Sequence, residues 1–119
     1  MNKILKAAFL EEMRKAKAHY AQSEWESAFA YLERAHVLGQ RNAVSHTVSH
    51  WWMMKVAVRR KDPKEILGQV PRLLFGGLTT LLGRAPIGNT GGANVGIMRP
   101  MPVPSELQEV FDRAAASPE

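Results

Sequence analysis

The 119-residue sequence predicts an all-α fold of four to five helices that form tetratricopeptide-like helical hairpins, followed by a C-terminal strap rich in glycine and proline. Three observations predict this fold. Apolar residues recur every three or four positions through most of residues 1–83, which is the period of an amphipathic helix. Residues that start or stop helices separate these segments. Glycine, proline and asparagine are concentrated after residue 83.

The first two predicted helices form a hairpin. The first carries an apolar stripe and ends at Gln22 and Ser23; the stripe comprises Leu5, Phe9, Met13, Ala16 and Tyr20. The second helix ends near Gly39, because glycine accepts the left-handed conformation that terminates many helices. Its stripe comprises Trp25, Ala28, Leu32 and Ala35. Small and aromatic residues at this spacing are typical of tetratricopeptide-type hairpins.

Two further helices follow. Asn42 is a good N-cap for a helix that extends to Arg60. Asp62 as N-cap and Pro63 at the first helical position start the next helix, which runs to about residue 82. Pro71 predicts a kink in it, or a division into two shorter helices. This helix is very apolar, and homodimerisation through it is a further hypothesis.

We expect one domain over residues 1–119, with a helical body over 1–83, a packed strap over 84–104 and a C-terminal helix over 105–116. Ser105 and Gln108 have the spacing of a capping box at the start of that last helix. The apolar residues of the strap indicate packing against the body; they are Ile87, Val95, Ile97, Met98, Met101 and Val103. The segment Gly88–Val95 favours a tight packed loop, with an anion-binding nest as the alternative.

Composition excludes several classes of protein. The absence of cysteine rules out disulfides and thiolate metal sites. The net charge is +5, but the basic residues near 55–64 follow a helix end, where cations complement the helix dipole, so we expect no nucleic-acid partner. No segment has the uncharged length of a secretory signal or a membrane span. We therefore predict a cytoplasmic protein.

The most informative feature is a set of side chains on either side of the turn at Gly39. Glu33 and His36 lie one turn apart on the second helix, and His46 and His50 lie one turn apart on the third. If the two helices are antiparallel, these four side chains converge. Imidazole and carboxylate ligands suit a transition metal such as zinc, copper or iron.

Other interpretations of this cluster stay open. The same residues could form a polar cluster that stabilises the fold without metal. Met53 or Met54 would add a soft ligand that favours copper(I). An enzyme with His46 or His50 as general base is a further alternative, but no nucleophile or paired carboxylate stands near them in sequence, which favours a non-catalytic protein.

Several strings together give the chain a family resemblance. Residues 31–40 (YLERAHVLGQ), His46 with His50 and Trp51, the Gly88–Val95 loop and residues 101–104 resemble a family of small bacterial proteins catalogued only as a domain of unknown function. The resemblance covers about residues 16–107. It implies no established activity, but Glu33, His36, His46 and His50 correspond to the family's pattern.

The sequence thus predicts a cytoplasmic metal-binding protein with Glu33, His36, His46 and His50 as ligands or as groups that support ligands. The alternative is a non-catalytic adaptor that binds a protein partner through its hairpins and through Trp51 and Trp52. That alternative predicts an exposed apolar patch and a fold that does not depend on metal.

Overall fold

The computed structural model describes residues 1–83 and 85–117, which form five α-helices and no β-strand. The helices are α1 (Lys3–Ala21), α2 (Trp25–Gly39), α3 (Ala43–Arg59), α4 (Pro63–Leu81) and α5 (Ser105–Ala116). The predicted all-α class is confirmed. The finer comparison with tetratricopeptide hairpins stays a prediction.

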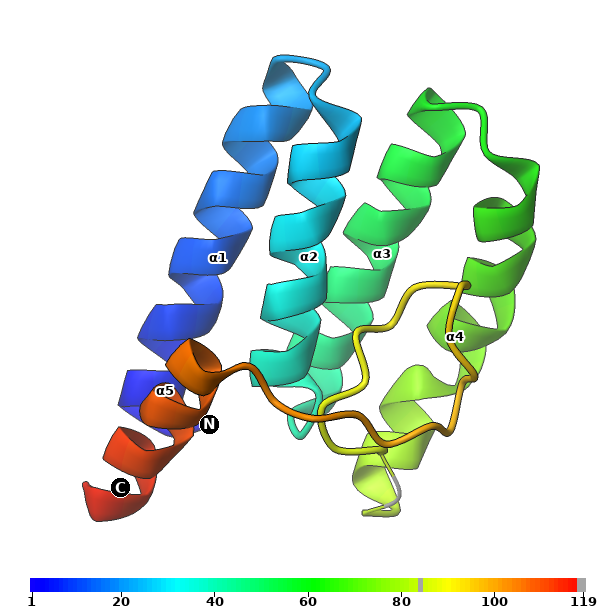
Figure 1. Cartoon of the computed structure of the whole chain (residues 1–119). Coiled ribbons are helices and arrows are strands. Elements are labelled where there is room, and N and C mark those ends of the chain that lie inside the picture. The colour runs from blue at the N-terminus through cyan, green and yellow to red at the C-terminus, as the bar shows by residue number, and fades with distance from the viewer. Residues whose placement is uncertain (84, 118–119) are drawn as a thin grey trace.

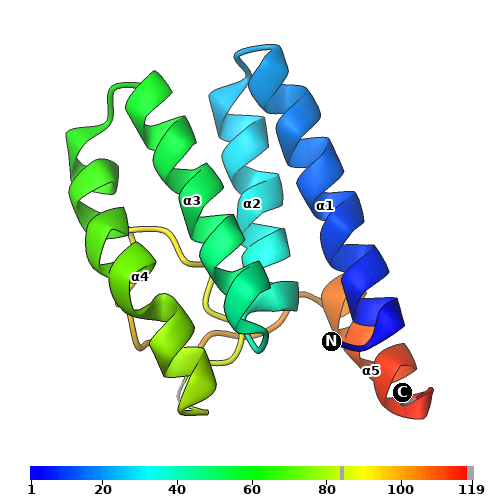
Figure 2. The same ribbon diagram turned by 180° about the vertical axis from the view of Figure 1, so that it is seen from behind.

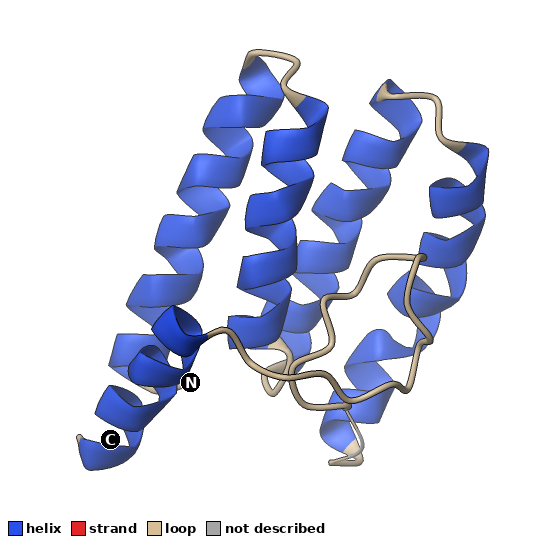
Figure 3. Ribbon diagram, in the orientation of Figure 1, coloured by secondary structure: helices blue, strands red, loops and turns tan. Residues whose placement is uncertain are grey.

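The first four helices lie side by side in chain order, each antiparallel to the one before it (Figures 1 and 2). The segment between α4 and α5 contains no regular element in its described residues and crosses one face of α2, α3 and α4 (Figure 3). We call residues 85–104 the strap. It ends at α5, which packs against α1 and α2.

Most helix boundaries follow from the sequence. The side chain of Asn42 accepts a hydrogen bond from the Ser45 N–H, and that of Asp62 accepts one from the Glu65 N–H, so both predicted N-caps are confirmed. The helix α4 continues through Pro71, and the predicted alternative of two separate helices is wrong.

The predicted capping box of α5 is also wrong. Pro104 is the N-cap residue of this helix, and Ser105 is already its first helical residue. The Pro104 carbonyl accepts hydrogen bonds from the N–H groups of Leu107 and Gln108. Because Ser105 lies inside the helix, its hydroxyl is directed to the Glu106 carboxylate instead of to a free backbone N–H.

Gly39 ends α2 for a reason that differs from the predicted one. The residues with positive φ in the described chain do not include Gly39, and Gln40 after it is still in the right-handed region. A Cβ atom at Gly39 would lie 2.8 Å from the Phe9 ring and 2.9 Å from the Ser45 Cβ atom. Glycine is therefore required at this turn because α1, α2 and α3 approach each other closely there.

The hydrophobic core lies between α1, α2, α3 and α5, and its largest buried members are Phe9, Met13, Leu32, Met53, Val56 and Leu107. Beside this core, Arg34 on α2 links α1 and α5. Its guanidinium binds Glu12 on α1 at 3.1 Å and Glu106 on α5 at 2.8 Å. These contacts fix α5 and therefore the C-terminal end of the strap.

The strap packs through its backbone more than through its apolar side chains. Gly88, Asn89, Gly91 and Gly92 are buried, whereas the apolar residues Ile87, Ile97 and Met98 are about half exposed. The buried part faces α4, whose own buried residues are Gln69, Arg72 and Gly76. Arg72 donates hydrogen bonds to the carbonyl groups of Gly92 and Val95 and holds the strap on α4.

Within the described part of the chain, no helix combines the length and the apolar character needed to cross a lipid bilayer.

Candidate metal centre

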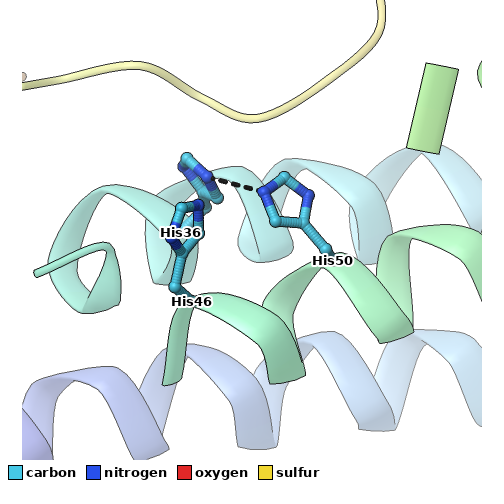
Figure 4. Close-up of side chains that lie close together, drawn as sticks. All are labelled: His36, His46 and His50. Carbon is cyan, nitrogen blue, oxygen red and sulfur yellow. Dashed lines mark hydrogen bonds between the residues drawn. The ribbon is translucent and has the colours of Figure 1, made fainter. Parts of the chain in front are cut away.

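Three histidines meet where α2 turns into α3. His36 lies on the last turn of α2, and His46 and His50 lie one turn apart on α3 (Figure 4). The centroids of their rings are 4.8, 4.6 and 4.9 Å apart, so the rings occupy the corners of a nearly equilateral triangle. The chain reversal therefore brings the three imidazoles together as the helical spacing predicted.

The three rings are buried and uncharged at neutral pH. Burial penalises the protonated form of an imidazole because a low-dielectric environment solvates charge poorly. It lowers the pKa of His46 to about 4 and that of His50 to about 3. Burial also holds the pKa of His36 well below its usual value, and the neighbouring His50 and His46 add to this effect. Neutral imidazole is the form that binds metals.

The strap fixes the proton of His36. The Nδ1 atom of His36 lies 2.6 Å from the backbone carbonyl oxygen of Asn89. A carbonyl oxygen only accepts hydrogen bonds, so the proton of the neutral ring is on Nδ1. Asn89 is itself held by its side chain, which donates to the carbonyl groups of Gly96 and Arg99 and accepts from the Gly91 N–H.

Gln69 fixes the proton of His50 in the same way. The Nδ1 atom of His50 lies 2.8 Å from Oε1 of Gln69. The amide is oriented by its nitrogen, which donates to the Glu65 carboxylate at 2.8 Å and to the Gly91 carbonyl at 3.0 Å. The amide oxygen therefore accepts the Nδ1 proton of His50.

Thr80 is a hydrogen-bond partner of His46. The Nδ1 atom of His46 lies 2.7 Å from the Thr80 hydroxyl oxygen. That hydroxyl donates its one proton to the carbonyl group of Gln40, at 2.5 Å. Its oxygen is left to accept a hydrogen bond from Nδ1 of His46, and the backbone carbonyl of Gly76 is a second acceptor for this ring.

The Nε2 atoms of His36 and His50 consequently carry free lone pairs. The Nε2 atoms of His36 and His50 lie 3.1 Å apart (Figure 4). One ring nitrogen from each of the three histidines can be chosen so that all lie within 4.8 Å of one another. Zinc–nitrogen bonds of 2.0–2.1 Å in a tetrahedral site would place two ligand nitrogens about 3.3 Å apart. The triad could therefore hold a metal ion.

A cavity of about 30 Å³ opens beside the three rings. A water molecule requires roughly 10–15 Å³ measured in this way, so the cavity has room for an ion with a small additional ligand but not for an organic substrate. Apolar side chains line its outer part; they are Phe75, Pro86, Ile97 and Met98. Gly76 lies directly against the rings of His46 and His50.

The remaining predicted site residues lie around the triad and not within it. Glu33 is not a member of the group of three. Its carboxylate accepts a hydrogen bond from the Thr90 side chain, and partial burial together with the nearby charge of Glu65 raises its pKa. The sulfur of Met53 lies 3.6 Å from Nε2 of Gln69, the residue that supports His50.

Three residues that orient the histidines were not predicted individually: Gln69, Thr80 and Asn89. Asn89 lay within the predicted loop but had no assigned role. A signal for Gln69 and Thr80 was present in the sequence. From residue 66 to 82 the chain is mostly apolar, and its interruptions at Gln69, Arg72, Gly76 and Thr80 fall at helical spacing on one face. A polar stripe on an apolar helix indicates a buried polar partner.

The fold and the site together define a small all-helical protein with a buried triad of histidines that could hold a metal ion. Residues 3–111 match a family described as a protein of unknown function, DUF3703, and the chain belongs to this family. The expected membership of a family of unknown function is confirmed. No curated protein and no solved structure shows significant similarity to the chain.

Proposed function

We propose that this protein binds a transition-metal ion through the Nε2 atoms of His36, His46 and His50. One observation supports the proposal: the Nδ1 atom of each ring lies within hydrogen-bond distance of an oxygen atom on α4 or the strap, and one ring nitrogen from each histidine lies within 4.8 Å of the others. Metal-binding histidines characteristically donate their other ring nitrogen to such an acceptor, which sets the tautomer and the ring orientation.

The donor set narrows the class of metal. Three neutral imidazoles suit zinc, copper(II) or iron(II), and a site with three protein ligands keeps a position open for water or another small ligand. The sulfur of Met53 lies against Gln69, so a thioether for copper(I) would have to come from Met98, which lines the cavity beside the triad. We assign Glu33 a supporting role, because it binds Thr90 beside the Asn89 carbonyl that orients His36.

Metal analysis and titration of the purified chain test this proposal. We expect the wild type to bind one equivalent of zinc, with cobalt(II) as a spectroscopic substitute. The double variant His46→Ala/His50→Ala is expected to lose at least about 100-fold in affinity, since two of three ligands are removed. The matched control is His19→Ala, because His19 binds Glu24 and stacks on Tyr31 outside the triad.

Two results would refute the proposal: equal metal content in the wild type and the double variant, or none in either. Circular dichroism shows whether the double variant is folded. If it is not, the single variant His46→Gln replaces it, because glutamine keeps a polar side chain of similar length at that position. A folded His46→Gln protein with wild-type metal affinity would also count against the triad.

A second candidate function is a protein-interaction domain, which the exposed indole of Trp51 favours. Trp51 is 54% exposed and lies on α3 in line with the exposed residues Val44 and Val58, seven positions away on each side. Trp52 instead packs against Tyr20. This candidate predicts that removal of metal by a chelator changes neither the fold nor the affinity for a partner; an affinity that requires metal would contradict it. The cytoplasmic location stays a prediction.

A further inference from the structure

The helix α4 has its polar face inside the molecule and its apolar face outside. Its buried residues are Gln69, Arg72 and Gly76. Seven large apolar side chains on the remaining surface of the helix are exposed; they are Leu67, Val70, Leu74, Phe75, Leu78, Leu81 and Leu82. An amphipathic helix at the surface of a monomer shows the opposite arrangement. We call these seven residues the outer face of α4.

The outer face is large enough for a stable interface. Leu67, Leu74 and Leu81 are 73%, 69% and 75% exposed. Taken together, the seven side chains offer on the order of 700 Å² of accessible area, close to what one partner contributes to a standard interface. The largest apolar patch of a typical monomer is about 300–600 Å². The outer face is therefore expected to be covered.

The spacing on this face indicates a helix as the group that covers it. Leu67, Leu74 and Leu81 recur every seven residues, and Val70 and Leu78 lie between them. The successive intervals are three, four, four and three residues, and apolar residues spaced by threes and fours form the seam along which two helices pack. A straight ridge of this kind fits another helix better than it fits an irregular loop.

The charge pattern identifies the partner as a second copy of the chain. Between residues 66 and 82 the only charged residue is Arg72, and its guanidinium faces the strap carbonyls. An uncharged face can meet its own copy about a two-fold axis without like-charge repulsion, and interfaces between identical chains are the most apolar class. A helix that lies on a lipid surface instead carries cations along its polar face, whereas the polar face of α4 is occupied by His50 and the strap.

We therefore propose that α4 packs against α4 of a second copy of this chain to form a symmetric homodimer. This inference is independent of metal binding. It concerns the outer face of α4 and not the exposed residues of α3 around Trp51. Phe75 belongs both to the outer face and to the lining of the metal-site cavity. The interface would thus border on the histidine triad.

Sedimentation velocity of the full chain, treated with a chelator, tests the proposal. We expect the wild type to have twice the mass of one chain, and Leu74→Glu to raise the dimer dissociation constant by at least about 100-fold, because the symmetric interface would bury two carboxylates. Leu74 is exposed in one chain, so the variant should keep its helical circular-dichroism spectrum. The matched control is Leu10→Glu on α1, at a residue that is 53% exposed and remote from α4; it should remain dimeric.

Three outcomes would overturn the proposal. They are a wild type that sediments as a monomer at micromolar to near-millimolar concentrations, a Leu74→Glu variant that remains dimeric, and a Leu10→Glu variant that dissociates as readily as Leu74→Glu. A monomeric wild type that co-sediments with phosphatidylglycerol vesicles would assign the outer face to lipid instead. None of these results depends on the metal titration, so the two proposals fail separately.

Discussion

The Nε2 atom of His36 lies 3.1 Å from the Nε2 atom of His50, and neither nitrogen carries a proton when both rings are neutral. Two lone pairs at this distance repel each other unless a proton or a cation lies between them. Burial makes a proton there costly, because it would leave an imidazolium in a low-dielectric site. A metal ion would resolve the conflict, since it can accept both lone pairs at once.

Gln69 should control metal affinity without touching the metal. Replacing it by leucine removes the acceptor for the Nδ1 proton of His50 and releases the Gly91 carbonyl. Loss of such a supporting hydrogen bond typically lowers metal affinity by 10- to 100-fold. We expect Gln69→Leu to show a decrease in this range in a competition titration with a chromophoric chelator. Gln108→Leu, at an exposed site on α5, is the control and should bind like the wild type.

Gly91 should tolerate no side chain. Its φ is +87°, and a Cβ atom would lie 2.7 Å from Cδ2 of His36. Gly91→Ala therefore combines backbone strain with a displaced His36 ring, and we expect a loss of roughly 1–3 kcal/mol in the free energy of unfolding together with weaker metal binding. Urea denaturation measures the first effect. The control is Gly96→Ala in the same strap, where the nearest atom to the added Cβ is 3.6 Å away. Equal losses in both variants would refute this account.

The residues of the site that could be predicted from the sequence are those that a single turn of the chain, between α2 and α3, brings together. His36, His46 and His50 are separated by a short turn and by one helical turn, so helix periodicity alone brings them together. The acceptors that orient them come from the strap and from α4, up to 53 residues away from His36. No local pattern specifies such pairings, and one sequence gives no signal for them apart from the polar stripe on α4.

One wrong prediction and one that holds only in part have the same physical origin. Gly39 was interpreted through backbone conformation, whereas the neighbouring Phe9 and Ser45 require its small size. The apolar residues of the strap were expected to pack on the body; Val103 does pack against the core, but Ile87, Ile97 and Met98 stay about half exposed, and the Asn89 carbonyl makes the contact with His36. In both cases tertiary packing decides the role of a residue, and local propensity does not.

The metal-free protein should lose stability as the pH falls. The pKa of each histidine is lower in the folded chain than the usual 6.5, so the unfolded chain binds more protons below that pH. The contribution of each uncharged ring to the free energy of unfolding is fully present above pH 6.5. It is lost as the pH falls towards 4 for His46 and towards 3 for His50. We expect each of these two rings to lower the free energy of unfolding by about 2 kcal/mol between pH 7.5 and pH 5. Urea midpoints in the presence of a chelator measure the loss.

A matched comparison separates this effect from general acid sensitivity. His46→Gln removes one titrating group from the site, so its free energy of unfolding should fall less steeply between pH 7.5 and pH 5 than that of the wild type. Gln108→Leu, which removes no titratable group and lies at an exposed site on α5, should keep the wild-type slope. The interpretation fails if the wild type is equally stable at both pH values.

Adjacent glycines on α4 provide the sharpest test of the cavity beside the triad. A Cβ atom at Gly76 would lie 3.3 Å from Cε1 and 3.4 Å from Nε2 of His46, and 3.5 Å from Cδ2 of His50. A Cβ atom at Gly77 would instead meet the Thr47 hydroxyl at 3.2 Å, away from the rings. Both replacements by alanine favour the helix by up to about 1 kcal/mol, so their effect on helix propensity cancels in the comparison.

We expect Gly76→Ala to weaken cobalt(II) binding or to change the visible spectrum of the bound ion, because its methyl group takes space that a small fourth ligand would occupy. Azide should then perturb the spectrum of wild-type and Gly77→Ala protein but not that of Gly76→Ala. Identical spectra and azide responses in all three proteins would show that the open side of the metal does not face Gly76.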